Sequence, residues 1–427
     1  MRSLIIIIII WWLIFGGYGL YTYFYPATTD RTTRIDTVPL LDQWTVSQAE
    51  EQQQPVDENP TEQWTDDDST DETPTDEQPA NDTPYNFEIV PVAEWLAVPW
   101  AVVETTPWRL LVTERAGRVR QIVDGELWAE PMLVLSQISN RAEEWLMSII
   151  LDPDYDQNAW VYLAYAQAAG GGMEVQVVRY TDQWDTLTDP FVVIGGLPAA
   201  QRHAWTALAF GPDGYLYVTV GDATDKQLAQ SRDVYHGKIL RITAQGEIPA
   251  DNPIPDSAIW SLWHRNPQWI DRTSAGEMYS SEHWPSTFDG PPWGDEINRI
   301  VAWANYGRPV VSHERTAEWM VDPIAVYTPA IAPASLLIYS WSMFPRRQDQ
   351  IFVGMLTGEW ILKVQIDPQD PNRIIQTEKI VDDSYGRVRF VWQWSDWSLY
   401  FTTSNEDWRW DSRSVRDGVY QIRLQSQ

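Results

Sequence analysis

Short runs in which apolar and polar residues alternate fill most of the chain after residue 86. The clearest is QRHAWTALAFGPDGYLYVTVGD (201–222), where an apolar segment at 207–210 is followed by Pro-Asp-Gly and an alternating segment at 215–220. Alternation with period two indicates a half-buried strand, and Pro-Asp-Gly between two such runs is typical of a hairpin turn. The stretch predicts a β-hairpin with His203 just ahead of its first strand.

The second half of this hairpin recurs along the chain. Six similar segments follow one another at roughly 50 to 70 residues: RLLVTER (109–115), WVYLAYA (160–166), YLYVTVG (215–221), EMYSSEH (277–283), QIFVGML (350–356) and SLYFTTS (398–404). No stretch sustains a 3.6-residue hydrophobic period, so the fold class is all-β with antiparallel sheets. One hairpin motif repeated radially predicts a six-bladed β-propeller over residues 86–427, with loops at one end of its channel carrying the chemistry.

The N-terminal part has a different character. Residues 4–25 form an almost uninterrupted apolar run preceded by Arg2. About 20 apolar residues span a bilayer as a helix, and a basic residue on the short side favours a cytoplasmic N-terminus. We expect residues 1–26 to be a transmembrane anchor that places the rest of the chain outside the cytoplasm at the cell membrane. A cleaved signal peptide is the alternative.

Residues 27–85 are expected to form a disordered acidic linker. Between residues 48 and 84 the chain is rich in Asp, Glu, Gln, Thr and Pro and contains no Lys or Arg. Such a segment cannot bury enough apolar surface to offset its ordering entropy. The alternative is an acidic tail that binds metal ions or a partner.

Composition narrows the function. The formal net charge of -30 argues against binding of nucleic acid or of an anionic membrane face. The absence of cysteine excludes disulfides, zinc thiolates, iron-sulfur clusters and thiol nucleophiles. A closed propeller has little exposed strand edge to pair, so a monomer is expected.

Candidate functional residues interrupt the β-like pattern. They are His203 and the runs HRNPQ (264–268), SEHWP (281–285), GDEINRI (294–300) and GRVR (386–389). Arg265, Arg387 and Arg389 are distant in sequence and can converge only across a channel, where guanidinium groups would bind a polycarboxylate. The alternative for each is structural: a salt-bridged surface arginine, or a histidine that serves only as a hydrogen-bonding group.

A series of motifs in a fixed order carries a family resemblance: AVPWAVV (97–103), RLLVTERAGRVR (109–120), LDPDY (151–155), FGPDGYLYVTVGD (210–222), HGKILRI (236–242), IPADNP (248–253), HRNPQ, SEH, GDEINRI, NYGRPVV (305–311) and TPAIAPAS (328–335). From about residue 93 to 424 the chain resembles the soluble quinoprotein glucose/sorbosone (aldose sugar) dehydrogenases. The resemblance implies a six-bladed propeller that holds pyrroloquinoline quinone (PQQ) and Ca²⁺ at the channel mouth. It also implies oxidation of an aldose or related alcohol, with electrons passed to an external acceptor.

The resemblance also assigns residues. His203 matches the catalytic general base, a role suited to a side chain whose pKa lies near neutrality. Cofactor-contacting positions match Glu143, Arg265, Asn266, Thr357, Arg387 and Arg389, and Thr357 stands where some members have lysine. Trp284 and Pro285 fall where backbone carbonyls bind Ca²⁺, a cation that prefers oxygen ligands. Asp222 and Gln227 fall near the sugar-binding edge.

Tryptophan often stands where this family has glycine, at positions 145, 205, 263, 269, 284 and 303. Within the chain itself, Trp397 and Trp108 occupy the hairpin position that Gly214 occupies in PDGYLYV. That position commonly needs φ > 0, which glycine adopts freely and a bulky residue does not. Our hypothesis is that many of these tryptophans are glycines in the living protein, because UGA codons that some bacteria read as glycine have been translated as tryptophan.

Two functional classes follow from these observations. The first is the anchored dehydrogenase, favoured by His203, the three arginines and the intact GDEINRI run. The second is a propeller without catalysis that acts as a surface binding or adhesion module. The altered TPAIAPAS run, the missing lysine at Thr357 and the indoles favour this alternative.

Overall fold

The computed structural model describes residues 87–138, 143, 145–284, 294–309, 319–339, 349–357, 359–381, 383–396, 398–407 and 415–424. All of them lie in one compact unit, Asn81–Gln427. The expected anchor (1–26) and acidic linker (27–85) lie outside the described residues. Within the described residues, which begin at Phe87, no helix is both long enough and apolar enough to cross a membrane.

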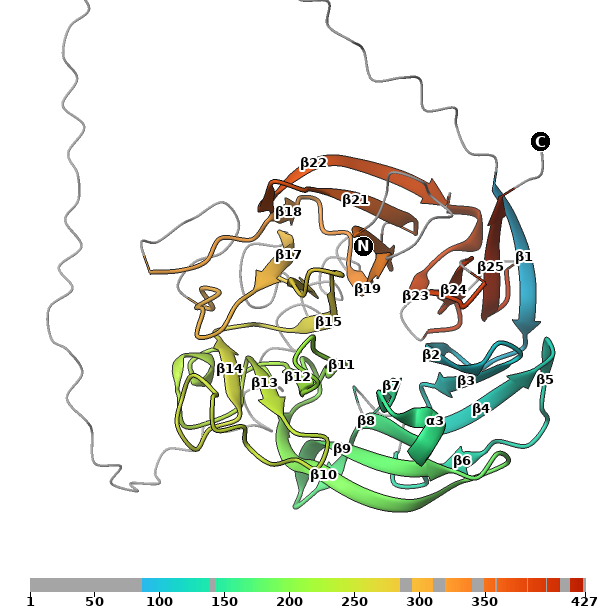
Figure 1. Cartoon of the computed structure of the whole chain (residues 1–427), viewed down its shortest axis with the longest axis horizontal. Helices are drawn as coiled ribbons and strands as arrows, with labels where there is room; N and C mark the ends of the chain where they lie inside the picture. Colours follow the sequence, from blue (N-terminus) through green and yellow to red (C-terminus); the bar gives the residue numbers. More distant parts are fainter. Residues whose placement is uncertain are drawn as a thin grey trace, which may run out of the picture. The chain divides into compact units, whose positions relative to one another are not determined.

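Six antiparallel sheets surround a central axis (Figure 1). The first contains β2 (Pro99–Thr106), β3 (Arg109–Glu114), β4 (Arg118–Val123) and β5 (Glu126–Leu127), with β6 (Leu133–Val134) paired to β4. The second contains β7 (Leu146–Leu151), β8 (Trp160–Ala169), β9 (Gly172–Asp182) and β10 (Leu187–Ala199), and the third β11 (Leu208–Phe210), β12 (Leu216–Val220), β13 (Lys238–Ile242) and β14 (Ile259–Leu262).

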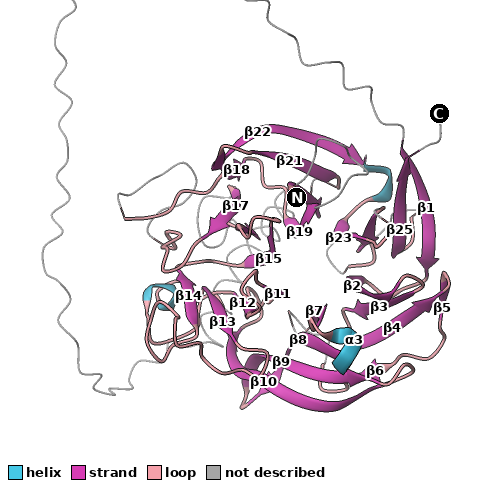
Figure 2. Ribbon diagram, viewed as in Figure 1, coloured by secondary structure: helices cyan, strands magenta, loops and turns pink. Residues whose placement is uncertain are grey.

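The other three sheets continue in chain order. The fourth contains β15 (Pro267–Arg272), β16 (Met278–Glu282), β17 (Asp295–Ile300) and β18 (Ala325–Tyr327). The fifth contains β19 (Pro333–Tyr339), β20 (Gln350–Met355), β21 (Ile361–Asp367) and β22 (Asp370–Val381), and the sixth β23 (Val388–Gln393), β24 (Leu399–Thr403), β25 (Gly418–Leu424) and β1 (Phe87–Glu94). The described helices are single turns, α3 (Tyr155–Asn158), η2 (Leu228–Gln230) and η3 (Asp383–Tyr385), as Figure 2 shows.

The predicted six-bladed propeller is confirmed. The six recurring segments contain β3, β8, β12, β16, β20 and β24, which are the second strand of each blade. The hairpin expected at 207–220 is β11 and β12, with Leu208 opposite Val218. Gly214 in its turn has φ 78°, as the sequence predicted. The related prediction for Trp108 is wrong, because the tight turn between β2 and β3 leaves Trp108 outside the residues with positive φ, and Trp397 lies outside the described residues.

The ring is closed by its two ends. β1, the first described strand, pairs antiparallel with β25, the last one, from Phe87 opposite Leu424 to Glu94 opposite Gly418. Each innermost strand contacts the next one around the ring, in the order β2, β7, β11, β15, β19, β23 and back to β2. The fold therefore has no open end at this seam, and residues from the first and last blades become neighbours.

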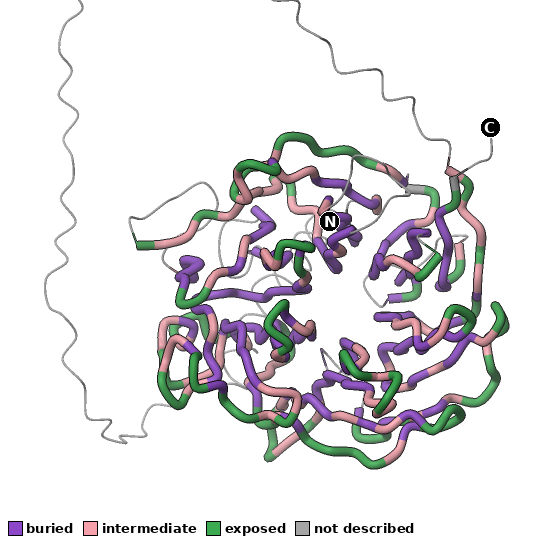
Figure 3. Tube along the Cα trace, in the orientation of Figure 1, coloured by how far each residue is buried: buried purple, intermediate pink, exposed green. Residues whose placement is uncertain are grey.

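Burial follows the position of a strand within its blade. Every residue of β3, β12, β13 and β20 is buried, because adjacent blades pack face to face on these strands. The outer strand β22 is largely exposed, and Figure 3 shows the same gradient from the buried inner strands to the exposed rim. The half-buried strand expected at 215–220 is therefore corrected, because β12 is buried on both faces between neighbouring blades.

Because β1 closes the ring, we expect the stability of the protein to depend on whether an N-terminal deletion removes β1. Deleting residues 1–94 removes a row of hydrogen bonds, each worth about 0.5–1.5 kcal/mol, so we expect a strongly lowered melting temperature and aggregation. Deleting residues 1–80 is the control and should leave the melting temperature unchanged. Equal melting temperatures for the two variants, measured by circular dichroism, would contradict the closure.

Candidate active site

The loop before β11 and the end of β12 bring a histidine and a carboxylate together. His203 Nδ1 lies 2.6 Å from Asp222 Oδ1, and both side chains are buried. His203 has φ 60°, a conformation that costs a residue other than glycine about 1–3 kcal/mol and is concentrated at functional sites. Gly221 permits the close approach, since a Cβ there would lie 2.1 Å from the His203 carbonyl oxygen.

Asp222 is held as an anion. Burial alone would raise its pKa, but the hydrogen bond from His203 and the nearby charges of His203, Arg308 and Arg265 lower the pKa below its usual value. Its second oxygen, Oδ2, accepts from Arg308 Nε at 3.0 Å. Because Asp222 accepts hydrogen bonds, Nδ1 of His203 must donate, and the lone pair of the neutral ring is then on Nε2. The ring is oriented as a general base requires.

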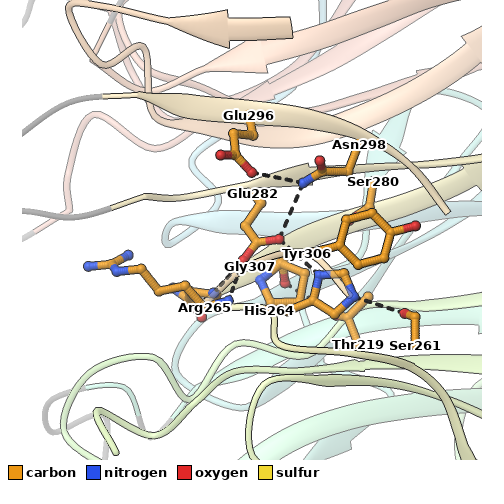
Figure 4. A network of polar contacts seen from close by, with 12 residues as sticks. Thr219, Ser261, His264, Arg265, Ser280, Glu282, Glu296, Asn298, Tyr306 and Gly307 are labelled. Atoms are coloured by element: carbon orange, nitrogen blue, oxygen red, sulfur yellow. Dashed lines mark hydrogen bonds and ion pairs between the residues drawn. The ribbon is translucent and has the colours of Figure 1, made fainter. Parts of the chain in front are cut away.

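The HRN turn before β15 is fixed by one buried carboxylate (Figure 4). Glu282, at the end of β16, accepts from the backbone N–H groups of Arg265 and Asn266 and lies 3.0 Å from His264 Nδ1. His264 Nε2 in turn lies 2.8 Å from Ser261 Oγ, and its ring stacks on Tyr306. Three consecutive residues are therefore positioned by Glu282.

A second carboxyl group extends this network. Asn298 on β17 donates from Nδ2 to Glu296 Oε2 at 3.1 Å and approaches Glu282 Oε2 at 3.5 Å (Figure 4). Burial raises the pKa of Glu296 well above its usual range, and the charge of Glu282 raises it further. Burial therefore disfavours the charged form of Glu296, whereas Glu282 accepts the backbone hydrogen bonds that organise the turn.

The HRN turn lies directly beside the histidine. The backbone N–H of Asp222 donates to the Arg265 carbonyl at 2.7 Å, and a Cβ on Gly221 would lie 2.9 Å from Asn266 Oδ1. Arg265 Nη1 donates to the His283 carbonyl at 2.8 Å. The structure thus brings His203, Asp222, Arg265 and Asn266 together, and we call these four residues the histidine group. The sequence had assigned them separate roles in catalysis, substrate binding and cofactor binding.

A second cluster, the arginine group, consists of Arg115, Arg387 and Arg389 around Asp407. Arg115 Nη1 lies 2.7 Å from Asp407 Oδ1, and Arg389 and Arg387 approach Oδ2 at 3.5 and 3.6 Å. These residues come from the first and last blades, which the ring closure makes neighbours. Two of the three arginines expected to converge, Arg387 and Arg389, therefore meet here together with Arg115, whereas Arg265 lies beside Asp222.

Trp205 joins the two groups. Its backbone carbonyl accepts from Gly221 N, next to Asp222, and its indole Nε1 donates to the Gln268 carbonyl. The same indole lies 5.0 Å from the ring of Trp100, and the Arg389 guanidinium lies 3.8 Å above Trp100. The indole of Trp205 therefore fills space between the histidine group and the arginine group.

The donor set fits an anionic, hydrogen-bonding cofactor such as a quinone with carboxylates. The guanidinium groups can bind carboxylates bidentately. Asn266 Oδ1 is buried and makes no hydrogen bond within the described part of the chain, which is an unsatisfied position that a ligand could complete. The charges and hydrogen-bonding groups of the site therefore suit such a cofactor, whereas the Trp205 indole reduces the space available to it.

The remaining predicted residues lie around these groups. Glu143 Oε2 accepts from Ala204 N at 2.9 Å, next to His203. Thr357 is exposed and follows Leu356, whose carbonyl accepts from Arg387 Nη1 at 3.3 Å. Gln227 is exposed on the loop after Asp222.

The predicted calcium ligands are only partly described. Trp284 is buried, and its N–H donates to Asp295 Oδ1 at 3.1 Å, while Pro285 lies outside the described residues. The described ranges contain no group of three or more His, Cys, Asp or Glu residues that could hold a metal ion. A site built on backbone carbonyls is not of that kind, so Ca²⁺ binding stays a prediction.

Sequence reasoning missed the roles of Asp222, Arg308, Glu282 and the Arg115–Asp407 pair. The first could have been found, because the register that places Leu208 opposite Val218 brings residues 203 and 222 to the same end of the hairpin. The two oxygens of Asp222 bind His203 and Arg308, so Asp222 orients the histidine, whereas the sequence had placed it at the sugar-binding edge. Arg115 and Asp407 meet only through ring closure, which leaves no local signal.

Together the fold and the site define a β-propeller with an oriented histidine beside arginine and asparagine groups whose chemistry suits an anionic ligand. The comparisons with known proteins agree. A family model described as Glucose / Sorbosone dehydrogenase matches residues 96–410. Aldose sugar dehydrogenase YliI of Escherichia coli is 26% identical over 362 residues, which cover 74% of this chain and 95% of that protein.

Two solved structures extend the comparison. A glucose dehydrogenase-type oxidoreductase of Thermus thermophilus is 33% identical with a TM-score of 0.72, covering 79% of this chain and 100% of that one. The PQQ-bound aldose sugar dehydrogenase of Streptomyces coelicolor is 25% identical with a TM-score of 0.69, covering 80% and 99%. The chain belongs to the glucose/sorbosone dehydrogenase family, as its motifs predicted.

The two buried carboxyl groups should respond differently to the same substitution. Glu282→Gln replaces an acceptor oxygen by an NH₂ group facing donors, so we expect a loss of about 2–4 kcal/mol in unfolding free energy. Glu296→Gln is the matched control and should change it by less than about 1 kcal/mol, because burial disfavours the charged form of Glu296 and a glutamine oxygen can still accept from Asn298. Urea unfolding at pH 7 measures both, and equal losses would contradict the special role of Glu282 in holding the turn.

Proposed function

We propose that this protein is a membrane-anchored, extracytoplasmic quinoprotein dehydrogenase that oxidises an aldose sugar or a related alcohol with PQQ and Ca²⁺. Electrons pass to an external acceptor. The observation that carries the proposal is the His203–Asp222 pair beside Arg265 and Asn266. Membership of the glucose/sorbosone dehydrogenase family and the PQQ-bound Streptomyces coelicolor relative support it.

Three residues of the chain would take part in proton transfer from the substrate. His203 would take the proton of the substrate hydroxyl on Nε2 as the alcohol is oxidised, and Asp222 would hold the ring and stabilise the imidazolium that forms. Arg308 would keep Asp222 ionised while that proton is held. PQQ, when bound, supplies a two-electron acceptor for the hydride of the alcohol carbon.

The cofactor would be held by groups on both sides of Trp205. Arg387 and Arg389 would bind its carboxylates, while Arg265 and Asn266 would contact it from the histidine side. Glu143 and Thr357 are further proposed contacts, and Gln227 is a proposed substrate contact at the exposed edge. Ca²⁺ would take the backbone carbonyls of Trp284 and Pro285.

Two substitutions should separate chemistry from cofactor binding. His203→Ala is expected to lower kcat by about 10²–10⁴-fold with little change in PQQ affinity, since it removes only the base. Arg389→Ala is expected to weaken PQQ binding by about 10–100-fold, since it removes a charged hydrogen-bonding partner. Stopped-flow turnover with an aldose and a dye acceptor, and fluorescence titration with PQQ in Ca²⁺, measure the two effects.

Arg373→Ala, on the exposed outer strand β22, is the charge-matched control and should change neither quantity. Full turnover by the His203→Ala variant would rule out the proposed base. Failure of the unsubstituted protein to bind PQQ would favour the binding or adhesion module, for which the buried indole of Trp205 beside Trp100 is the supporting observation.

The anchor is proposed from the apolar run at residues 4–25. In a bacterial host the full chain should sediment with membranes and be degraded by external protease in spheroplasts, whereas a variant lacking residues 1–26 should stay soluble inside the cell. Recovery of a soluble, shortened mature chain would instead indicate a cleaved signal peptide.

A further inference from the structure

Four tryptophans occupy a backbone conformation that suits glycine. Trp95, Trp184, Trp263 and Trp303 have φ angles of 72°, 77°, 65° and 62°. In this left-handed region an L-residue brings its Cβ close to its own backbone, and a bulky side chain there is a genuine outlier. Only Trp263 and Trp303 belong to the set that the family resemblance had singled out, so Trp95 and Trp184 are an independent observation.

The other residue types at positive φ make the contrast clear. Within the described ranges, aspartate also contributes four residues, Asp124, Asp189, Asp256 and Asp349. Aspartate is enriched in this region because its short polar side chain bonds to nearby backbone, whereas an indole has no such compensation. An equal number of tryptophans is therefore unexpected.

The surroundings show that the backbone and not the indole sets these conformations. Trp303 N donates to the Trp260 carbonyl at 2.7 Å, and the Trp263 carbonyl accepts from Arg308 N at 2.9 Å. Trp184 N donates to Asp182 Oδ1 at 2.8 Å, and its carbonyl accepts from Arg109 Nη2 at 2.6 Å. Each bond uses main-chain atoms that glycine also has.

The indoles themselves contribute little in return. Three of the four are well exposed, at 69% for Trp95, 42% for Trp184 and 39% for Trp303. Trp263 is buried, and its Nε1 makes no hydrogen bond within the described part of the chain, which is unfavourable for a buried donor. The cation–π contact of Arg416 over Trp95 lies at the surface, where it is weak, whereas that of Arg109 over Trp184, at 4.5 Å, involves a buried cation.

We infer that positions 95, 184, 263 and 303 are glycines in the protein as its own cell makes it, encoded by UGA read as glycine. UGA connects the two residues because different genetic codes read it as tryptophan or as glycine. The inference rests on backbone geometry and is independent of the proposed dehydrogenase activity. Trp205 has an ordinary φ, so its own case depends on its codon, and glycine there would open the space between the histidine and arginine groups.

The first test is the gene. The inference requires UGA at codons 95, 184, 263 and 303, and UGG at the two control positions, Trp128 and Trp392. UGG at the four positions would overturn it. Peptide mass spectrometry of the protein from its own cells gives the same decision directly, since glycine and tryptophan differ greatly in mass.

The second test is stability, with matched controls. Replacing all four tryptophans by glycine should raise the melting temperature by about 5 °C, because four strained sites are relieved. Two pairs are matched for exposure: Trp263 (9%) with Trp392 (6%), and Trp303 (39%) with Trp128 (38%). The single glycine variants at 263 and 303 should melt higher than the starting protein, and those at 392 and 128 lower.

A lower melting temperature for the 263 and 303 variants, comparable to their controls, would contradict the inference. This readout needs no cofactor. A glycine variant that gains stability but binds no PQQ would leave the inference intact and would count against the proposed dehydrogenase.

Discussion

Closure of the ring by β1 and β25 is the constraint on which the rest of the structure depends. It makes the first and last blades neighbours, so that Arg115 reaches Asp407 across 292 residues of sequence. Without it β25 would have an unpaired edge, and β1 would no longer hold the start of the first blade to the last blade. The arginine group is thus a product of topology, and its charges are confined to a buried place where their interactions are strong.

The histidine group depends on contacts between residues that are closer in sequence. One hairpin, β11 and β12, brings His203 to Asp222, and the neighbouring blade supplies Arg265 and Asn266 through a turn held by Glu282. Two buried carboxylates therefore do different work in adjacent blades. Asp222 selects the tautomer of His203, and Glu282 fixes the backbone of the HRN turn, while burial disfavours the charged form of Glu296.

The fold could be predicted from the sequence because one hairpin motif is repeated six times. The repetition indicates a propeller even where the strand pattern of a single copy is not distinctive. His203, Arg265 and Arg389 could be named from motifs. Of their partners, Asp222 follows from the register of the hairpin, whereas Arg308, Arg115 and Asp407 could not be assigned, because only the folded ring brings them to the site. The same limit applies to the tryptophans. The comparison of hairpins predicted a positive φ for Trp108, which the structure does not have, whereas the positive φ of Trp184 could be found only from the structure.

The central claim is that His203 acts as a base on a sugar hydroxyl at a bound quinone, and reduction of that quinone by substrate tests it most directly. The full chain, loaded with PQQ and Ca²⁺, would be mixed with an aldose without an electron acceptor while the absorbance of the quinone is followed. The account predicts rapid loss of the oxidised quinone absorbance, slowed by about 10²–10⁴-fold in His203→Ala. A bound quinone that no aldose or related alcohol reduces, or one reduced equally fast without His203, would contradict it.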